Sequence, residues 1–270
     1  MVLPLTGGIT NRNWRVEAGG ESFVLRVAGE KTSLLGIDRH CEHAASLAAA
    51  TLGIGPEVVA YLPEHQALVT RFVAGRVLAT GDVDDTNVIS RIVRSLRRYH
   101  ESPPGAGRFC GFTTIRDYHR QSIMHGVPLP AAVGVAIAQL AEIERSLPAA
   151  EPLCPCHNDL LPANLIDDGT TVRIIDWEYA GMGDRWFDLG NFAENHRLNR
   201  RQEECLLNEY FSELRPDDLR RLHAMRRVSA LREATWGFLQ TGISSLDFDF
   251  LGYANDHLER FFADPNARID

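Results

Sequence analysis

The segment CHNDLLPANLI (156–166) and the DWEYAG that begins at Asp176 hold side chains that could perform phosphoryl transfer. The first segment contains Asp159 and Asn164, and Asp176 follows the apolar run VRII. Phosphoryl transfer needs a carboxylate that orients the attacking hydroxyl and accepts its proton. It also needs ligands for Mg²⁺, which prefers hard oxygen donors. We therefore predict Asp159 as the base and Asn164 and Asp176 as metal ligands.

The spacing of these residues supports the same interpretation. The pattern H-x-D-x4-N is that of a kinase catalytic loop, and an Asp a short way on is its metal-binding partner. Leu165 and Ile166 are predicted to form a strand that pairs with VRII through a turn at DDGT (167–170). The two metal ligands would then lie at adjacent ends of one hairpin. The alternative is that Asp159 and Asn164 only cap turns.

Two further stretches could bind a nucleotide. LTGGITNRNWRV (5–16) places Gly8 and Asn11 before the first expected strand, and backbone N–H groups of a glycine turn can face phosphates. Arg26 lies in the middle of the apolar strand FVLRV, where a buried charge needs a partner, and Glu42 in the following helix is the natural one. The alternatives without a binding role are a hairpin end for the glycines and an exposed edge position for Arg26.

These residues require a sheet with one helix, followed by a helical region. Residues 11–29 read as a hairpin turning at Gly19-Gly20, 38–53 as a helix with Asp38 as N-cap, and 56–75 as two strands. This gives the order ββαββ. Helical periodicity then dominates over residues 86–101, 114–125, 130–146, 200–213, 217–240 and 250–263. We predict an α+β fold with a small β-rich lobe (1–74) and a larger, mainly helical lobe (75–270).

Composition excludes some classes of function. The 270 residues carry a formal net charge of −8 with a pI near 5.7, which argues against a nucleic-acid partner and is compatible with a small cationic substrate. The most apolar stretch (130–144) is too short to span a membrane.

No signal peptide is visible and the five cysteines are an odd number, so we expect a cytoplasmic protein with reduced thiols. Cys154, Cys156 and His157 suggest zinc, but no second cluster completes a tetrahedral set.

At this point a family resemblance is visible over almost the whole chain. The sequence resembles the choline/ethanolamine kinases, including bacterial choline kinase-like proteins, within the wider aminoglycoside phosphotransferase-like group. The segments that carry the resemblance are LTGGITNRNW, FVLRV, CHNDLLPANLI, IDWEYAGMGDRWFDLGNFAE and WGFLQTGISSLDFDFLGYANDHLERFF. The resemblance implies a two-lobed protein kinase-like fold that uses ATP and Mg²⁺.

The same resemblance implies a role for each matching residue. It implies Asp159 as base, His157 as a support of the catalytic loop, and Asp188 and Asn191 in FDLGN as further supports, with Asp188 accepting backbone N–H bonds. It assigns Arg26 to the ATP phosphates. The remaining nucleotide-side roles go to Glu42 as the partner of Arg26, to Gly8 and Asn11, and to the segment 69–75 around Phe72, which should meet the adenine.

The acceptor pocket is predicted from aromatic and acidic positions. In choline kinases an aromatic cage with nearby carboxylates faces the ammonium. Trp236, Phe248 and Tyr253 match aromatic positions, whereas Glu233 stands where the family often has a second Trp. A carboxylate suits a primary ammonium, which donates hydrogen bonds, better than a methylated one. The other acidic candidates are Glu178 and Glu194; for each aromatic residue, core packing is the alternative.

We therefore expect an ATP-dependent kinase that phosphorylates the hydroxyl of an amino alcohol of the choline or ethanolamine type. The alternatives are a thiamine, aminoglycoside or sugar kinase of the same fold, or a non-catalytic pseudokinase. A pseudokinase would lack Asp159, Asn164 or Asp176, and all three are present. The expected assembly is a monomer or a homodimer.

Overall fold

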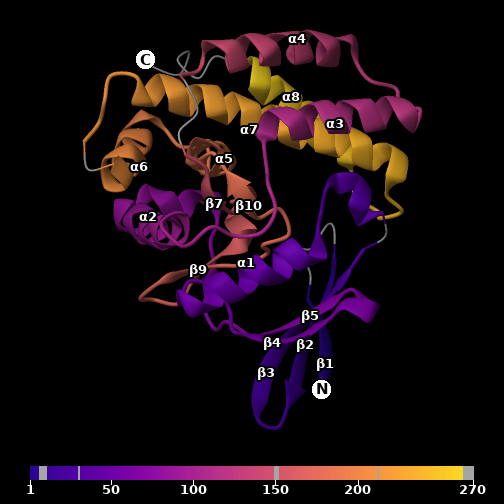
Figure 1. Ribbon diagram of the computed structural model, residues 1–270, viewed down its shortest axis with the longest axis vertical. Helices are drawn as coiled ribbons and strands as arrows, with labels where there is room; N and C mark the ends of the chain where they lie inside the picture. The colour runs from indigo at the N-terminus through magenta and orange to yellow at the C-terminus, as the bar shows by residue number, and fades with distance from the viewer. Residues whose placement is uncertain (6–10, 30, 149–151, 212, 264–270) are drawn as a thin grey trace.

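The N-terminal region is an antiparallel sheet with one helix, as Figure 1 shows. The computed structural model describes residues 1–5, 11–29, 31–148, 152–211 and 213–263. The sheet has five strands in the order β1-β2-β3-β5-β4, and α1 lies between it and the rest of the molecule (Figure 1). The bounds are β1 Val2–Leu5, β2 Asn11–Ala18, β3 Glu21–Ala28, α1 Arg39–Thr51, β4 Val58–Leu62 and β5 Ala67–Arg71.

The predicted order ββαββ is confirmed except for one strand. The turn between β2 and β3 has Gly19 and Gly20 at φ of +62° and +82°, as a two-residue hairpin requires. Asp38 accepts hydrogen bonds from the backbone N–H groups of His40 and Cys41 and so caps α1. Strand β1 was missed because VLPL is apolar at every position and exposed at every position, so it shows no alternation.

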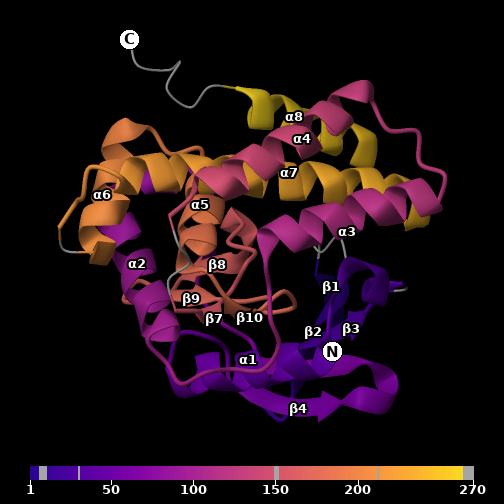
Figure 2. The same cartoon turned by 45° about the horizontal axis from the view of Figure 1, so that its top comes forward.

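The second region is mainly helical (Figures 1 and 2). Every predicted helix is confirmed, with ends within a few residues: α2 Thr86–His100, α3 Gly111–Met124, α4 Ala131–Ser146, α6 Arg200–Phe211, α7 Asp218–Ile243 and α8 Phe250–Phe262. Helix α5 (Arg185–Asn195) was not predicted. After its first residue every position of α5 is buried, and a helix enclosed on all sides carries no amphipathic period.

Short strands and 3₁₀ turns make up the rest of the regular structure. β6 (Arg76–Val77), β8 (Leu165–Asp167) and β9 (Val172–Ile174) form one small sheet, in which the predicted β8–β9 hairpin pairs Leu165 with Ile174. β7 (Cys154–Cys156) pairs with β10 (Gly181–Gly183), and both are too short to show alternation. The 3₁₀ turns are η1 Thr32–Leu35, η2 Pro63–His65, η3 Thr80–Asp84 and η4 Pro162–Asn164.

Two apolar clusters stabilise the helical region. The larger one fills the space among α2, α5, α6 and α7, with Trp177, Phe192 and Phe238 among its buried side chains. The smaller one joins Leu35 to Trp236 on α7 and thereby links the two regions. Within the described residues, none of the helices combines the length and the apolar character that a membrane crossing needs.

A buried histidine makes the stability of this core sensitive to acid. His196 is 1% exposed against the Phe192 ring, and neither ring nitrogen has a partner among the described residues. Burial lowers the pKa of His196 from 6.5 to about 4. Between pH 6.5 and 4, His196 is therefore protonated in the unfolded chain but stays neutral in the folded chain. As the pH falls through this range, the free energy of unfolding falls by up to about 3 kcal/mol.

We expect His196→Phe to weaken this pH dependence. Urea unfolding at several pH values between 4 and 6.5 measures the slope of the free energy of unfolding. The exposed His65, changed to Gln, is the control and should leave the slope as in the wild type. A slope equally steep in His196→Phe would contradict the assignment.

Candidate active site

The catalytic loop begins where β7 ends, and one carboxylate of α5 holds its backbone. Asp188, with no exposed surface, accepts hydrogen bonds from the backbone N–H groups of His157 at 2.7 Å and Asn158 at 2.6 Å. Asn158 has φ of +67°, a left-handed conformation that this carboxylate helps to fix. The predicted contact of Asp188 with loop N–H groups is therefore confirmed.

Asn191, one helical turn further along α5, holds the next part of the loop. Its Oδ1 accepts a hydrogen bond from the backbone N–H of Leu160 at 2.5 Å, and its Nδ2 donates to Oγ of Ser229 on α7 at 3.0 Å. The two side chains predicted as supports thus bind three backbone N–H groups of the loop, at residues 157, 158 and 160.

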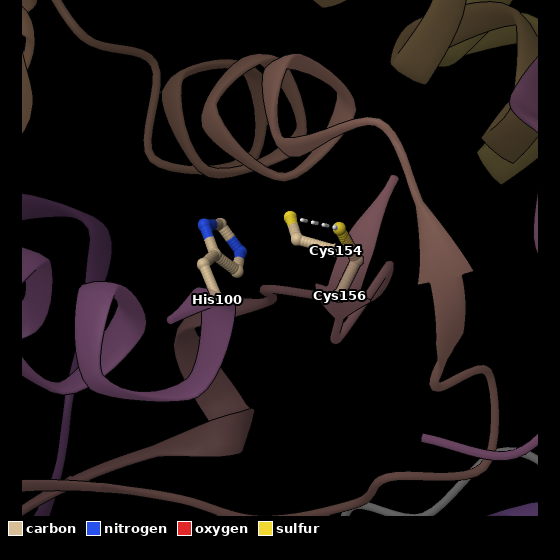
Figure 3. Close-up of side chains that lie close together, drawn as sticks. All are labelled: His100, Cys154 and Cys156. Carbon is tan, nitrogen blue, oxygen red and sulfur yellow. Dashed lines mark hydrogen bonds between the residues drawn. The ribbon is translucent and has the colours of Figure 1, made fainter. Parts of the chain in front are cut away.

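Of the three metal-capable side chains His100, Cys154 and Cys156, the histidine contacts Asp188. Figure 3 shows His100 beside Cys154 and Cys156, whose Sγ atoms are 3.7 Å apart. Nε2 of His100 is 2.9 Å from Asp188 Oδ2, and Nδ1 is 2.6 Å from the hydroxyl of Tyr210. Since both ring nitrogens already have partners, this histidine positions the Asp188 carboxylate.

His157, which the zinc alternative would have paired with the cysteines, faces the other way. Its Nδ1 accepts the backbone N–H of Asp159 at 3.2 Å, which leaves Nε2 to donate to the carbonyl oxygen of Ile175 at 3.0 Å. Burial lowers the pKa of His157, so the ring is neutral in this arrangement. The histidine thereby ties the loop to the residue before Asp176, in agreement with its expected supporting role.

Asp159, Asn164 and Asp176 come together as the spacing predicted. Nδ2 of Asn164 donates to Oδ2 of Asp159 at 3.2 Å and to its backbone carbonyl at 2.9 Å. The N–H of Ile175 donates to the carbonyl of Asn164 at 2.9 Å, so Asn164 and Asp176 lie at adjacent ends of the β8–β9 hairpin. Burial raises the pKa of Asp159 well above its ordinary range, which strengthens it as a proton acceptor.

Two side-chain oxygens at this hairpin are available to bind a hard cation. Oδ1 of Asn164 and Oδ2 of Asp176 have no hydrogen-bond donor in the part of the chain that the structure describes. Amide and carboxylate oxygens are the ligands that Mg²⁺ prefers. Asp176 also has φ of +63°, a left-handed conformation that residues other than glycine rarely adopt.

Arg26 connects the sheet with this hairpin. Its guanidinium bonds to Glu42 of α1, as predicted, and also to Asp176, which was not predicted. Because the Arg26 side chain is only 12% exposed, the two carboxylates compensate a largely buried charge. The cation predicted for the phosphates therefore lies directly beside a predicted metal ligand.

A second arginine, missed from the sequence, lies beside the residues predicted to bind the nucleotide. Arg39 at the start of α1 donates to Glu42 at 2.6 Å, to Glu178 at 3.3 Å and to Asn11 at 3.0 Å. Asn11 in turn donates to Glu178 at 2.8 Å. The spacing of Arg39 and Glu42, three residues apart on one helix, is the signal that could have identified this pair.

Two predicted nucleotide contacts remain predictions. Gly8 lies outside the described residues. The backbone N–H of Phe72 donates to the carbonyl of Ser22 at 2.9 Å, and the Phe72 ring lies under the Arg15 guanidinium at 4.3 Å. The N–H of Phe72 is therefore already used, which leaves its carbonyl and the neighbouring backbone for an adenine.

On the acceptor side, Asp159 meets a buried arginine that sequence reasoning missed. Arg232 of α7 is 2% exposed, and its Nη1 donates to Oδ1 of Asp159 at 3.2 Å and to Oε1 of Glu233 at 2.6 Å. Its guanidinium lies 4.2 Å from the centre of the Tyr179 ring. The position of Arg232 four residues before Trp236, hence on the same face of α7, is the signal that could have revealed it.

The predicted aromatic residues lie around Tyr253, which contacts Glu233. Trp236 packs edge-on against Tyr253 at 5.6 Å, and the Tyr253 hydroxyl donates to Oε2 of Glu233 at 2.7 Å. Phe248, 42% exposed, lies 6.0 Å from the Tyr253 ring. Burial raises the pKa of Glu233, but the charge of Arg232 and the Tyr253 hydroxyl together bring it below its ordinary value. Glu233 is therefore ionised.

Glu194 is placed differently from these residues. It bonds to Arg226 of α7 at 3.1 Å and to Arg260 of α8 at 2.7 Å, so its charge already has two partners. A substrate contact of Glu194 stays a prediction, and these ion pairs count against it.

Comparison with known proteins places the whole arrangement among phosphotransferases. Residues 2–227 match the model of the phosphotransferase enzyme family. The chain is 26% identical over 211 residues to protein LicA of Haemophilus influenzae, covering 76% of this chain and 61% of LicA, so it spans less than two thirds of that relative. It is 27% identical to ethanolamine kinase 2 of Mus musculus, covering 94% of this chain and 74% of that protein.

A solved structure shows the same fold at higher identity. The crystal structure of a choline/ethanolamine kinase family protein from Mesorhizobium loti superposes with a TM-score of 0.83 and 30% sequence identity. The match covers 97% of this chain and 86% of that one. The two-lobed kinase-like architecture expected from the sequence is thus confirmed.

Proposed function

We propose, since the chain belongs to the phosphotransferase enzyme family and to its choline/ethanolamine kinase group, that it transfers the γ-phosphoryl group of ATP to the hydroxyl of a small amino alcohol. The observation that carries this proposal is the position of Asp159. Asp159 is bonded to Asn164, and Asn164 and Asp176 lie at adjacent ends of one hairpin. Arg26 is bonded to Asp176. A base, two oxygen ligands and a cation are the parts that phosphoryl transfer needs.

The chain's own residues account for each atom that moves. Asp159 orients the acceptor hydroxyl and takes its proton while the hydroxyl oxygen bonds to the γ-phosphorus. The bond from that phosphorus to the bridging oxygen breaks, and ADP leaves with the electron pair. Asn164 and Asp176 would hold Mg²⁺, which when bound neutralises charge on the phosphates. The loop contacts of Asp188 and Asn191 keep Asp159 in place.

The nucleotide would lie between the proposed lobes, residues 1–74 and 75–270. Arg26 and Arg39 bring two positive charges to the side of Asp176 that faces the sheet. ATP phosphates would exchange for part of the carboxylate contacts of Arg26. The backbone of residues 69–75 is the proposed adenine contact, as the family resemblance implies.

An acceptor panel tests the proposal. Choline, ethanolamine and 3-amino-1-propanol would be supplied with ATP and Mg²⁺, with coupled ADP detection and phosphorus NMR of the products. We expect phosphate ester formation with at least one amino alcohol, loss of turnover when EDTA removes Mg²⁺, and recovery when Mg²⁺ is restored. ADP release that no acceptor accelerates, without a phosphate ester, would contradict the proposed function.

A further inference from the structure

The carboxylates on the acceptor side of Asp159 already have donors from the protein itself. Oε1 of Glu233 accepts from Arg232, and Oε2 accepts from the Tyr253 hydroxyl. Oδ1 of Asp159 accepts from Arg232, and Oδ2 accepts from Asn164. The oxygens that could have bound a substrate ammonium are therefore largely engaged within the chain.

The other acidic candidates are engaged as well. Glu178 accepts from Asn11 and Arg39, and Glu194 bonds to two arginines. The space between Asp159, Glu233 and the Tyr179 ring, where a substrate cation could have been held, contains the Arg232 guanidinium. A quaternary ammonium placed there would meet a like charge and would offer no hydrogen bond.

Two side chains of α7, Arg232 and Trp236, have buried donors that lack partners among the described residues. Nε and Nη2 of Arg232 and Nε1 of Trp236 are buried and have no hydrogen-bond partner among the described residues. Arg232 is 2% and Trp236 5% exposed, and both lie on one face of α7, a single turn apart. A buried donor without an acceptor is costly, so this face fits a ligand that supplies acceptor oxygens.

We propose that the acceptor carries a carboxylate beside its hydroxyl, and that Arg232 with Trp236 binds that carboxylate. This rests on the proposed function and narrows it to amino alcohols of the hydroxy-amino acid class. The planar guanidinium presents paired donors that match a carboxylate. Because Arg232 also bonds to Asp159, a carboxylate on its remaining donors is held beside the base that takes the hydroxyl proton.

Matched acceptor pairs test the role of the carboxylate. L-serine differs from ethanolamine, and L-homoserine from 3-amino-1-propanol, only by the added carboxylate. In the wild type we expect kcat/KM to be higher for the carboxylate-bearing member of at least one pair by about tenfold or more. Arg232→Met should abolish that preference. Arg220→Met, on the exposed side of the same helix, is the control and should leave it unchanged.

A second variant covers the case in which Arg232→Met fails to fold, since it leaves Asp159 and Glu233 without their cation. Trp236→Phe keeps an aromatic ring and removes only the indole N–H. We expect it to raise KM for the carboxylate-bearing acceptor about tenfold more than KM for the matched amino alcohol. Equal changes for both members of the pair would count against the inference.

The outcomes separate this inference from the proposed function. Wild-type preference for ethanolamine and 3-amino-1-propanol over their carboxylate-bearing partners would overturn the inference and leave the function standing. If folded Arg232→Met lost kcat equally for every acceptor, Arg232 would act on the transferred phosphoryl group and not on an acceptor carboxylate. That result would also overturn the inference. Phosphorylation of none of the acceptors would overturn the function and the inference together.

Discussion

Asp159→Asn is expected to lower kcat by about 10³-fold, within the range typical of a lost general base. The amide has nearly the shape of the carboxylate but cannot take the hydroxyl proton. KM for ATP should change little, because Arg26, the cation proposed for the phosphates, bonds to Glu42 and Asp176 and keeps both contacts in the variant. Steady-state kinetics with coupled ADP detection measures both quantities with the preferred acceptor.

The matched control is Asp217→Asn, which changes an exposed aspartate near the start of α7 that pairs with exposed Arg220. It should keep kcat at the wild-type level. A fall in kcat of less than about tenfold in Asp159→Asn would show that another group accepts the proton. Equal stability of the two variants would show that the loss is chemical and not a consequence of unfolding.

The sequence predicts those parts of the site whose residues lie close together along the chain. Asn164 and Asp176 are joined by a hairpin of three-residue strands, so their spacing in sequence nearly determines their spacing in space. The Arg26–Glu42 pair was predictable for a different reason. A charge on an apolar strand needs a partner, and the next helix offered one.

The part that could not be predicted depends on long-range contacts. Arg232 lies 73 residues from Asp159, and its position on the same helix face as Trp236 does not predict which carboxylate it contacts. The bond of Arg26 to Asp176 spans 150 residues. Helix α5, which carries Asp188, was recognised as a motif but not as a helix, because its enclosure removes the periodic signal.

The prediction for Glu233 shows how such a contact changes an interpretation. From the sequence, a carboxylate in place of a Trp favours a primary ammonium. In the structure both of its oxygens are occupied, one by its neighbour Arg232 and one by Tyr253. Glu233 therefore forms an ion pair with Arg232. The charge that the pocket offers to a substrate is set by this pair and not by the Glu233 carboxylate alone.

The second large effect is expected for Asp188→Ala, which removes the carboxylate beneath the catalytic loop. Three donors lose their acceptor in a site with no exposure: the backbone N–H groups of His157 and Asn158, and His100 Nε2. A buried unsatisfied donor costs about 1–3 kcal/mol, so the free energy of unfolding should fall by roughly 3–6 kcal/mol. In a thermal melt this corresponds to a Tm lower by roughly 10–20 °C.

The activity of Asp188→Ala distinguishes a positioning role from a purely structural one. If Asp188 orients the loop, the fraction that stays folded at low temperature should still show a reduced kcat, since Asp159 follows directly after the released N–H groups. Asp184→Ala is the matched control: this residue caps the same helix through the N–H of Trp186 and pairs with Arg221, so its loss should cost about 1–2 kcal/mol and leave kcat unchanged. A wild-type kcat in folded Asp188→Ala would mean that Asn191 and His157 hold the loop without it.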